Sequence, residues 1–149
     1  MIKYSLVRKN RLPSLLMVSD DNKERYVGNA QDIFDIMKEV NVCDLPEEYV
    51  YLLSINTRGR VLGFFEVSHG DTDICHVSPA QIITRLLLTG GRSAVIVHNH
   101  PSGDTSPSSC DIELTKTVKS ALDVVHIKLL DHVIVSSKSY ISMADMKML

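Results

Sequence analysis

Two histidines, His98 and His100, flank a single asparagine and are followed by Pro101, and a carboxylate, Asp111, comes after the next loop. Neutral imidazoles and carboxylates are ligands that Zn²⁺ accepts. Three such protein ligands with the fourth position open are typical of a catalytic rather than a structural zinc site. A bound zinc ion makes water a nucleophile at neutral pH. The spacing therefore predicts a catalytic zinc site made by His98, His100 and Asp111.

The flanking sequence predicts the elements that must position these ligands. Residues 94–97 form a short apolar run after Gly90-Gly91, which indicates a buried strand that ends at His98. Pro101 prevents the chain from continuing in the sheet. A helical pattern starts near Pro107, and the spacing of Asp111 and Leu114 places both on its inward stripe.

The same residues also fit simpler interpretations. Ser108 and Asp111 have the spacing of a capping box, in which they would only satisfy backbone groups of a helix end. Ser106 before Pro107 is an equally good N-cap, and it would leave Ser108 and Asp111 free. A His-x-His pair alone is a weak signal, so the prediction depends on the complete pattern.

The complete pattern resembles a known family. His98-Asn99-His100-Pro101 through Ser108-x-x-Asp111 looks like the JAMM metalloprotease motif. With Leu129-Leu130-Asp131-His132 downstream, it resembles the bacterial RadC-like branch, and the resemblance runs from about Val50 to Met143. It implies a zinc-dependent hydrolase that cleaves a peptide or isopeptide bond in a peptide or protein substrate. Relatives often carry Arg-Glu where Ala80-Gln81 stand, and a helix-hairpin-helix region unlike anything in residues 1–45.

Two further residues are candidates for catalysis. Glu66 lies between Phe65 and Val67 in an expected strand with two apolar faces, where a carboxylate needs a partner or a function. We predict it to be the general base, with a strand-end position open to solvent as the alternative. Ser108 is predicted to donate a hydrogen bond to the oxyanion. Glu113 should face away from the site, since it is two helical positions past Asp111.

Length and element order predict the fold class. The 149 residues suffice for one domain with its own core, and we expect a lead-in of unclear role over residues 1–45 and a RadC-like MPN/JAMM domain over 46–149. Strands and helices alternate, which is typical of an α/β protein. We therefore expect a layered α-β-α, JAB/MPN-like domain with a mixed sheet and a cytidine deaminase-like architecture.

Charge and cysteine content restrict partners and compartment. The net charge is −2 and basic residues are scattered, which does not favour nucleic-acid binding. A nucleic-acid-processing or DNA-repair-associated protein is therefore the alternative rather than the leading hypothesis. A non-catalytic metal-binding module is a second alternative. Three cysteines without a CxxC spacing suggest free thiols in a reducing cytoplasm. No window is long and apolar enough for a leader peptide or a membrane span. His69 and His76 bracket Asp71, Asp73 and Cys75 in what reads as a polar loop rather than a second metal site.

Overall fold

The chain is built around one seven-stranded mixed sheet with strand order β2-β1-β4-β3-β5-β6-β7. The computed structural model describes residues 1–70 and 77–149. In chain order the elements are β1 (Ile2–Lys9), β2 (Leu12–Asp20), α1 (Ala30–Glu39), β3 (Tyr49–Ile55), β4 (Val61–His69), α2 (Pro79–Thr89), β5 (Ser93–Asn99), α3 (Ser109–Val124), β6 (Lys128–Val135) and β7 (Tyr140–Ser142).

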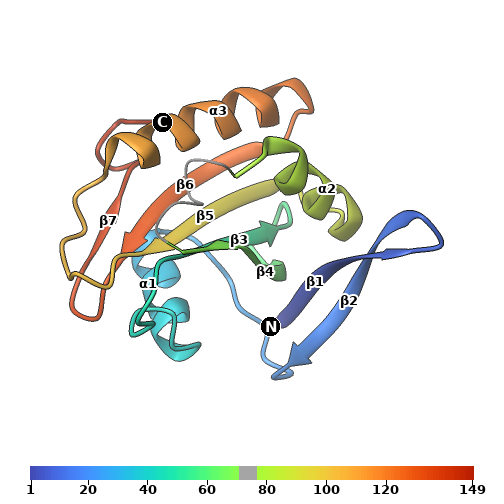
Figure 1. The fold of residues 1–149 in the computed structure, drawn as a ribbon, viewed down its shortest axis with the longest axis horizontal. Coiled ribbons are helices and arrows are strands. Elements are labelled where there is room, and N and C mark those ends of the chain that lie inside the picture. The colour runs from blue at the N-terminus through green and yellow to red at the C-terminus, as the bar shows by residue number, and fades with distance from the viewer. Residues whose placement is uncertain (71–76) are drawn as a thin grey trace.

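Helices cover both faces of the sheet. Helix α1 packs on one face, and α2 and α3 pack on the other (Figure 1). Two apolar clusters result, one around Met37 and Phe64 on the α1 side and one around Ile96 and Leu122 on the α2–α3 side. Because β1–β4 and β5–β6 are parallel while the other pairs are antiparallel, the sheet is mixed. The expected layered α-β-α architecture is confirmed.

Strand β5 lies in the middle of this arrangement. Ala94 and the residues that follow it to Asn99 are buried, as expected for a strand covered on both faces. Its antiparallel partner β3 places Val50 opposite His98, and its parallel partner β6 places Ile134 beside His98. Val50 belongs to the cluster on the α2–α3 side, so His98 points toward the helices of that side.

Helix α3 begins with a capping box in which Ser108, not Ser106, is the N-cap. The helix therefore starts at Ser109, slightly later than the sequence predicted. It buries Leu114, Val118 and Leu122, each of which contributes about 1.5–3 kcal/mol of hydrophobic stabilisation. This buried stripe continues to Asp111 and thereby fixes the carboxylate against the sheet.

Residues 1–45 share the sheet and the core with the rest of the chain. Strand β1 pairs in parallel with β4 through Lys3 and Phe64, and α1 buries Ile33 and Met37 against the sheet. Asn29 is the N-cap residue of α1. The β1–β2 hairpin extends the sheet and projects from the body of the molecule, with β2 at the edge (Figure 1).

The ends of helix α2 agree only in part with the sequence pattern. Gly90 ends the helix in a left-handed conformation with φ of 72°, which favours glycine. Ser78 is the N-cap residue and Pro79 the first helical residue. Ser78 and Gln81 have the spacing of a capping box, but the Ser78 side chain makes no capping hydrogen bond.

The cysteines differ from the expectation of free thiols. Cys43 is free and buried, whereas Cys110 in the first turn of α3 is disulfide-bonded. The prediction of a reducing compartment rested on free thiols, so the disulfide of Cys110 removes its basis. The predicted polar loop with Asp71, Asp73, Cys75 and His76 lies outside the described residues. Within the described ranges, no helix has both the length and the apolar character that crossing a membrane requires.

Candidate metal centre

The end of β5 and the start of α3 bring the three predicted metal ligands together. His98 Nδ1 lies 2.9 Å from Asp111 Oδ1, and His100 Nε2 lies 3.7 Å from Asp111 Oδ2. The two imidazole rings meet edge to face, with centroids 4.5 Å apart. His98 and Asp111 are fully buried, while the His100 side chain keeps a small exposed fraction of 11%. The cluster is therefore closed on the side of the core and reached from the side of His100.

Several polar atoms in this cluster are buried without a hydrogen-bond partner. They are both ring nitrogens of His98 and the Oδ1 atom of Asp111. Leaving such atoms unsatisfied costs about 1–3 kcal/mol each, so buried polar groups almost always have partners. A cation would satisfy the lone pair of one His98 nitrogen and a carboxylate oxygen at once, and imidazole with carboxylate is a donor set suited to Zn²⁺. The residues present thus fit a metal ion.

Asp111 is a helix-capping residue and a candidate ligand at the same time. Its Oδ2 atom accepts hydrogen bonds from the Ser108 amide and the Ser108 hydroxyl, both at 2.7 Å. Its Oδ1 atom makes none and faces His98. The two interpretations of Ser108-x-x-Asp111 are therefore compatible, because each uses a different oxygen of one carboxylate.

The charge on Asp111 is fixed by its surroundings. Burial by itself would raise the pKa of this carboxyl group, but contacts with His98 and hydrogen bonds from Ser108 outweigh it and hold the pKa well below its usual range. Asp111 is consequently a carboxylate at neutral pH, the form that binds a cation.

The tautomer of His100 follows from its hydrogen bond. His100 Nδ1 lies 2.6 Å from the carbonyl oxygen of Asp104, which can only accept, so Nδ1 carries the proton. The Nε2 atom then has a free lone pair on the side of Asp111. A histidine ligand fixed through its second nitrogen in this way is typical of metal sites.

Glu48 is part of the cluster, and sequence reasoning missed it. Its Oε2 atom lies 3.7 Å from His98 Nε2, and Glu48, His98 and His100 form a group able to hold a metal ion. The backbone on both sides of Glu48 is held by Asn99, whose side chain donates to the Glu47 carbonyl at 2.9 Å and accepts from the Tyr49 amide at 2.8 Å. The sequence feature that could have indicated Glu48 is an acidic residue just before an apolar strand.

The structure does not bring Glu66 to this cluster. Glu66 pairs across the sheet with Tyr51, on the α1 side, whereas His98 pairs with Val50 on the opposite side. Its carboxylate contacts Lys3 at 3.8 Å and His69 at 3.3 Å, and its side chain is 38% exposed. Burial raises the pKa of Tyr51, and the charge of Glu66 beside it raises it further. The expected strand is present, but the Glu66 side chain reaches solvent, which was the alternative to a role as general base.

Two other predictions concern the first turns of α3. Glu113 is exposed, so it faces away from the cluster as predicted. The Ser108 hydroxyl lies beside the cluster, but it donates its proton to Asp111 Oδ2. In this arrangement Ser108 orients a ligand, and its proton is not directed at a substrate.

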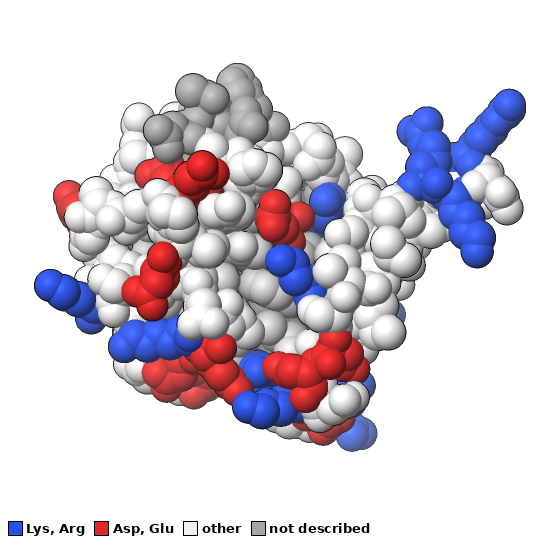
Figure 2. Space-filling view, turned by 60° about the horizontal axis from the view of Figure 1, so that its bottom comes forward, with Lys and Arg blue, Asp and Glu red and all other residues white. Residues whose placement is uncertain are grey.

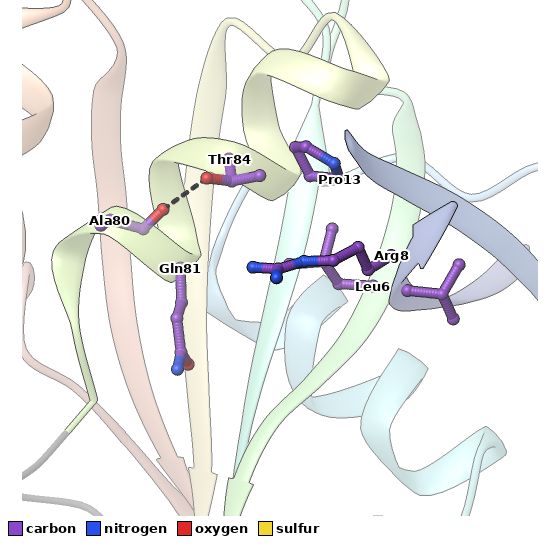
Figure 3. Close-up of a pocket in the computed structure, with 7 residues that line it drawn as sticks. Leu6, Arg8, Pro13, Ala80, Gln81 and Thr84 are labelled. Carbon is purple, nitrogen blue, oxygen red and sulfur yellow. Dashed lines mark hydrogen bonds between the residues drawn. The ribbon is translucent and has the colours of Figure 1, made fainter. Parts of the chain in front are cut away.

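A separate cavity of about 390 Å³ lies between the β1–β2 hairpin and α2. Figure 3 shows Arg8 and Leu6 from β1 facing Gln81 and Thr84 from α2. Its lining is mostly apolar, and none of its lining residues belongs to the metal-ligand cluster. The size of this cavity alone is therefore no reason to place the catalytic site there.

Comparison with known proteins agrees with the geometry. Residues 27–148 match the model of the RadC-like JAB domain family. The chain is 34% identical over 128 residues to a UPF0758 protein of Chlorobaculum parvum, covering 86% of this chain and 57% of that protein. It is 41% identical over 100 residues to one of Pseudomonas fluorescens, covering 67% and 45%. The chain thus spans about half the length of these relatives. It belongs to the RadC-like JAB domain family.

Proposed function

We propose that this chain is a zinc-dependent hydrolase of the JAMM type that cleaves a peptide or isopeptide bond. The observation that carries the proposal is the buried set of ligand atoms on His98 and Asp111 next to His100, in which His98 Nδ1 and Asp111 Oδ1 lie 2.9 Å apart without hydrogen-bond geometry. Membership of the JAB domain family supports the same reaction class. An unsatisfied buried cluster of this kind is costly for a purely structural core, and a functional metal accounts for it.

The residues divide the chemistry among them. His98, His100 and Asp111 would hold Zn²⁺, which supplies Lewis acidity and lowers the pKa of water to about 7. Glu48, beside His98 and partly open to solvent, would take a proton from the attacking water on Oε2 and return it to the leaving amine. Asn99 positions Glu48 by holding its two flanking peptide groups. Ser108 holds Asp111, and it could contact an oxyanion only if its proton left Asp111 Oδ2.

The test is hydrolysis of a peptide library and of branched peptides that contain a lysine isopeptide bond. Wild-type protein loaded with zinc should cleave at least one of these substrates, and a chelator should abolish cleavage reversibly. Glu48→Gln should lower the rate on the order of 10²–10⁴-fold with zinc content unchanged, because only proton transfer is removed.

Glu66→Gln is the matched control for that experiment. It removes the same charge from the same type of residue on the opposite side of the sheet, and it should leave hydrolysis unchanged. If Glu66→Gln is inactive while Glu48→Gln is fully active, the assignment of the base is wrong. If zinc-loaded wild-type protein cleaves none of the substrates, the hydrolase proposal fails.

Nucleic acid is the second candidate partner, and one observation favours it. Arg8, Lys9 and Arg11 lie at the tip of the β1–β2 hairpin, so basic residues are less scattered in space than in sequence. Figure 2 shows Lys and Arg side chains gathered at this projecting end of the molecule. Such a cluster suits phosphate groups. Salt-dependent binding of duplex DNA that is lost in Arg8→Ala/Lys9→Ala/Arg11→Ala would support this candidate, and equal binding by both proteins would remove it.

A further inference from the structure

His132, in the middle of β6, is a fully buried histidine that the roles above do not use. It lies beside Ile96 of β5, so it points to the same side of the sheet as His98. The ring centroids of His98 and His132 are 6.2 Å apart. His132 thus borders the metal-ligand cluster on the side opposite the opening at His100.

Thr115 determines which nitrogen of His132 carries the proton. The Thr115 hydroxyl donates to the Asp111 carbonyl oxygen at 2.6 Å, and it lies 2.6 Å from His132 Nδ1. A hydroxyl has a single proton, and a carbonyl oxygen can only accept. Thr115 therefore accepts from His132 Nδ1–H, and Nε2 is the unprotonated nitrogen of a neutral imidazole.

That unprotonated Nε2 atom is buried without a hydrogen-bond partner. His98, Asp111 and His132 form a group whose ligand atoms lie within 4.8 Å of one another, and all three residues are buried. His132 therefore presents a free lone pair to the same cluster in which Asp111 Oδ1 is also unsatisfied. A histidine that served only the core would have both nitrogens satisfied.

We propose that His132 is a ligand of the metal, the third imidazole of the centre, on its buried side. This inference rests on the proposed metal site. With His98, His100, Asp111 and His132 as ligands, a water would be the fifth ligand, a number that zinc in catalytic sites reaches in the transition state. Thr115 then has the supporting role of fixing the tautomer of this ligand, as the Asp104 carbonyl does for His100.

The first test counts imidazoles by X-ray absorption at the zinc edge in the wild-type protein. Three histidine ligands are expected, and two would overturn the inference. This measurement needs no substitution, so a misfolded variant cannot obscure it. It also needs no substrate, so its result is independent of hydrolase activity.

The second test compares His132→Asn with His126→Asn by zinc titration against a competing chelator. His126 is exposed and has a positive φ of 56°, a conformation that asparagine tolerates, so it is the matched control. His132→Asn should weaken zinc binding more than about 10-fold and reduce the imidazole count to two, while His126→Asn should match wild type. Equal affinity in all three proteins would overturn the inference about His132 alone. Absence of zinc binding by the wild type would instead overturn the proposed function.

Discussion

Helices α1 and α3 begin with the same local motif, yet only one of them forms a candidate site. In α1, the Asn29 side chain accepts from the Asp32 amide at 3.0 Å, and Asp32 Oδ2 accepts from the Asn29 amide at 3.1 Å. In α3, Ser108 and Asp111 make the equivalent pair of hydrogen bonds at 3.2 and 2.7 Å. Both are complete capping boxes.

The two boxes differ in what surrounds the acid. Asp32 is only half-buried, and Asn29 is exposed, so solvent reaches the α1 box. Asp111 is fully buried, and its second oxygen faces His98. A capping box needs only one carboxylate oxygen. The environment of the remaining oxygen, rather than the motif, therefore distinguishes a structural cap from a cap that also serves a site.

Isosteric replacement of Asp111 and of Asp32 should have the largest difference in effect between the two boxes. In Asp111→Asn the new side chain would keep one oxygen for the Ser108 donors but would turn an NH₂ group toward the metal position. This change should therefore weaken zinc binding more than about 100-fold, beyond the usual effect of losing a residue that only supports a ligand. In Asp32→Asn the NH₂ group can turn to solvent, and zinc affinity should stay at the wild-type value. Calorimetric zinc titration measures both, and equal affinities in the two variants would refute the distinction between the boxes.

The pH dependence of the metal-free protein gives the next largest effect. Burial, helped by the neighbouring His98, lowers the pKa of His132 from 6.5 to about 3. Between these values the unfolded chain binds a proton that the folded chain does not, so the free energy of unfolding rises with pH and is lost as pH falls through this window. The stabilising contribution of Asp111, whose pKa is lowered, is lost only below its ordinary value of 3.8.

Urea unfolding of the metal-free protein should therefore show a loss of about 2 kcal/mol between about pH 6 and pH 4 that His132→Asn removes. The same loss in the variant and in the wild type would show that His132 does not remain neutral in the folded protein. Asp32→Asn serves as the control from the α1 box, and it should retain the wild-type slope over this window.

The smallest expected effect distinguishes the N-cap residues Ser108 and Asn29. Ser108→Ala and Asn29→Ala should each lower the free energy of unfolding by about 1 kcal/mol, because each removes one N-cap hydrogen bond. Only Ser108→Ala should also weaken zinc binding, by about 10–100-fold, because Ser108 orients Asp111. A change in zinc affinity of similar size in Asn29→Ala would mean that the effect is global.

The candidate ligands could be predicted from sequence because their geometry is local. His98 and His100 are two positions apart on one strand end, and Asp111 follows on the next helix, so strand and helix periodicity alone bring them together. Glu48 could not be found this way. Its place beside His98 depends on the antiparallel register of β3 and β5 and on the clamp made by Asn99.

The error at Glu66 has a related physical cause. Phe64 and Phe65, which lie on opposite faces, correctly indicate a strand covered on both faces, but hydrophobicity does not reveal which face carries the site. Alternation along the strands, read through their register, places Glu66 with Tyr51 and away from His98. The same limit applies to β1, because its sequence does not reveal that β2 covers it and places it inside the sheet.

Elemental analysis shows directly whether a metal is held at the end of β5 and the start of α3. Wild-type protein should contain one zinc ion per chain, whereas His98→Ala and His100→Ala should contain almost none and still show the circular dichroism of a folded α/β domain. The exposed His126→Asn should keep the full zinc content. Equal zinc content in the wild type and both alanine variants would contradict the account.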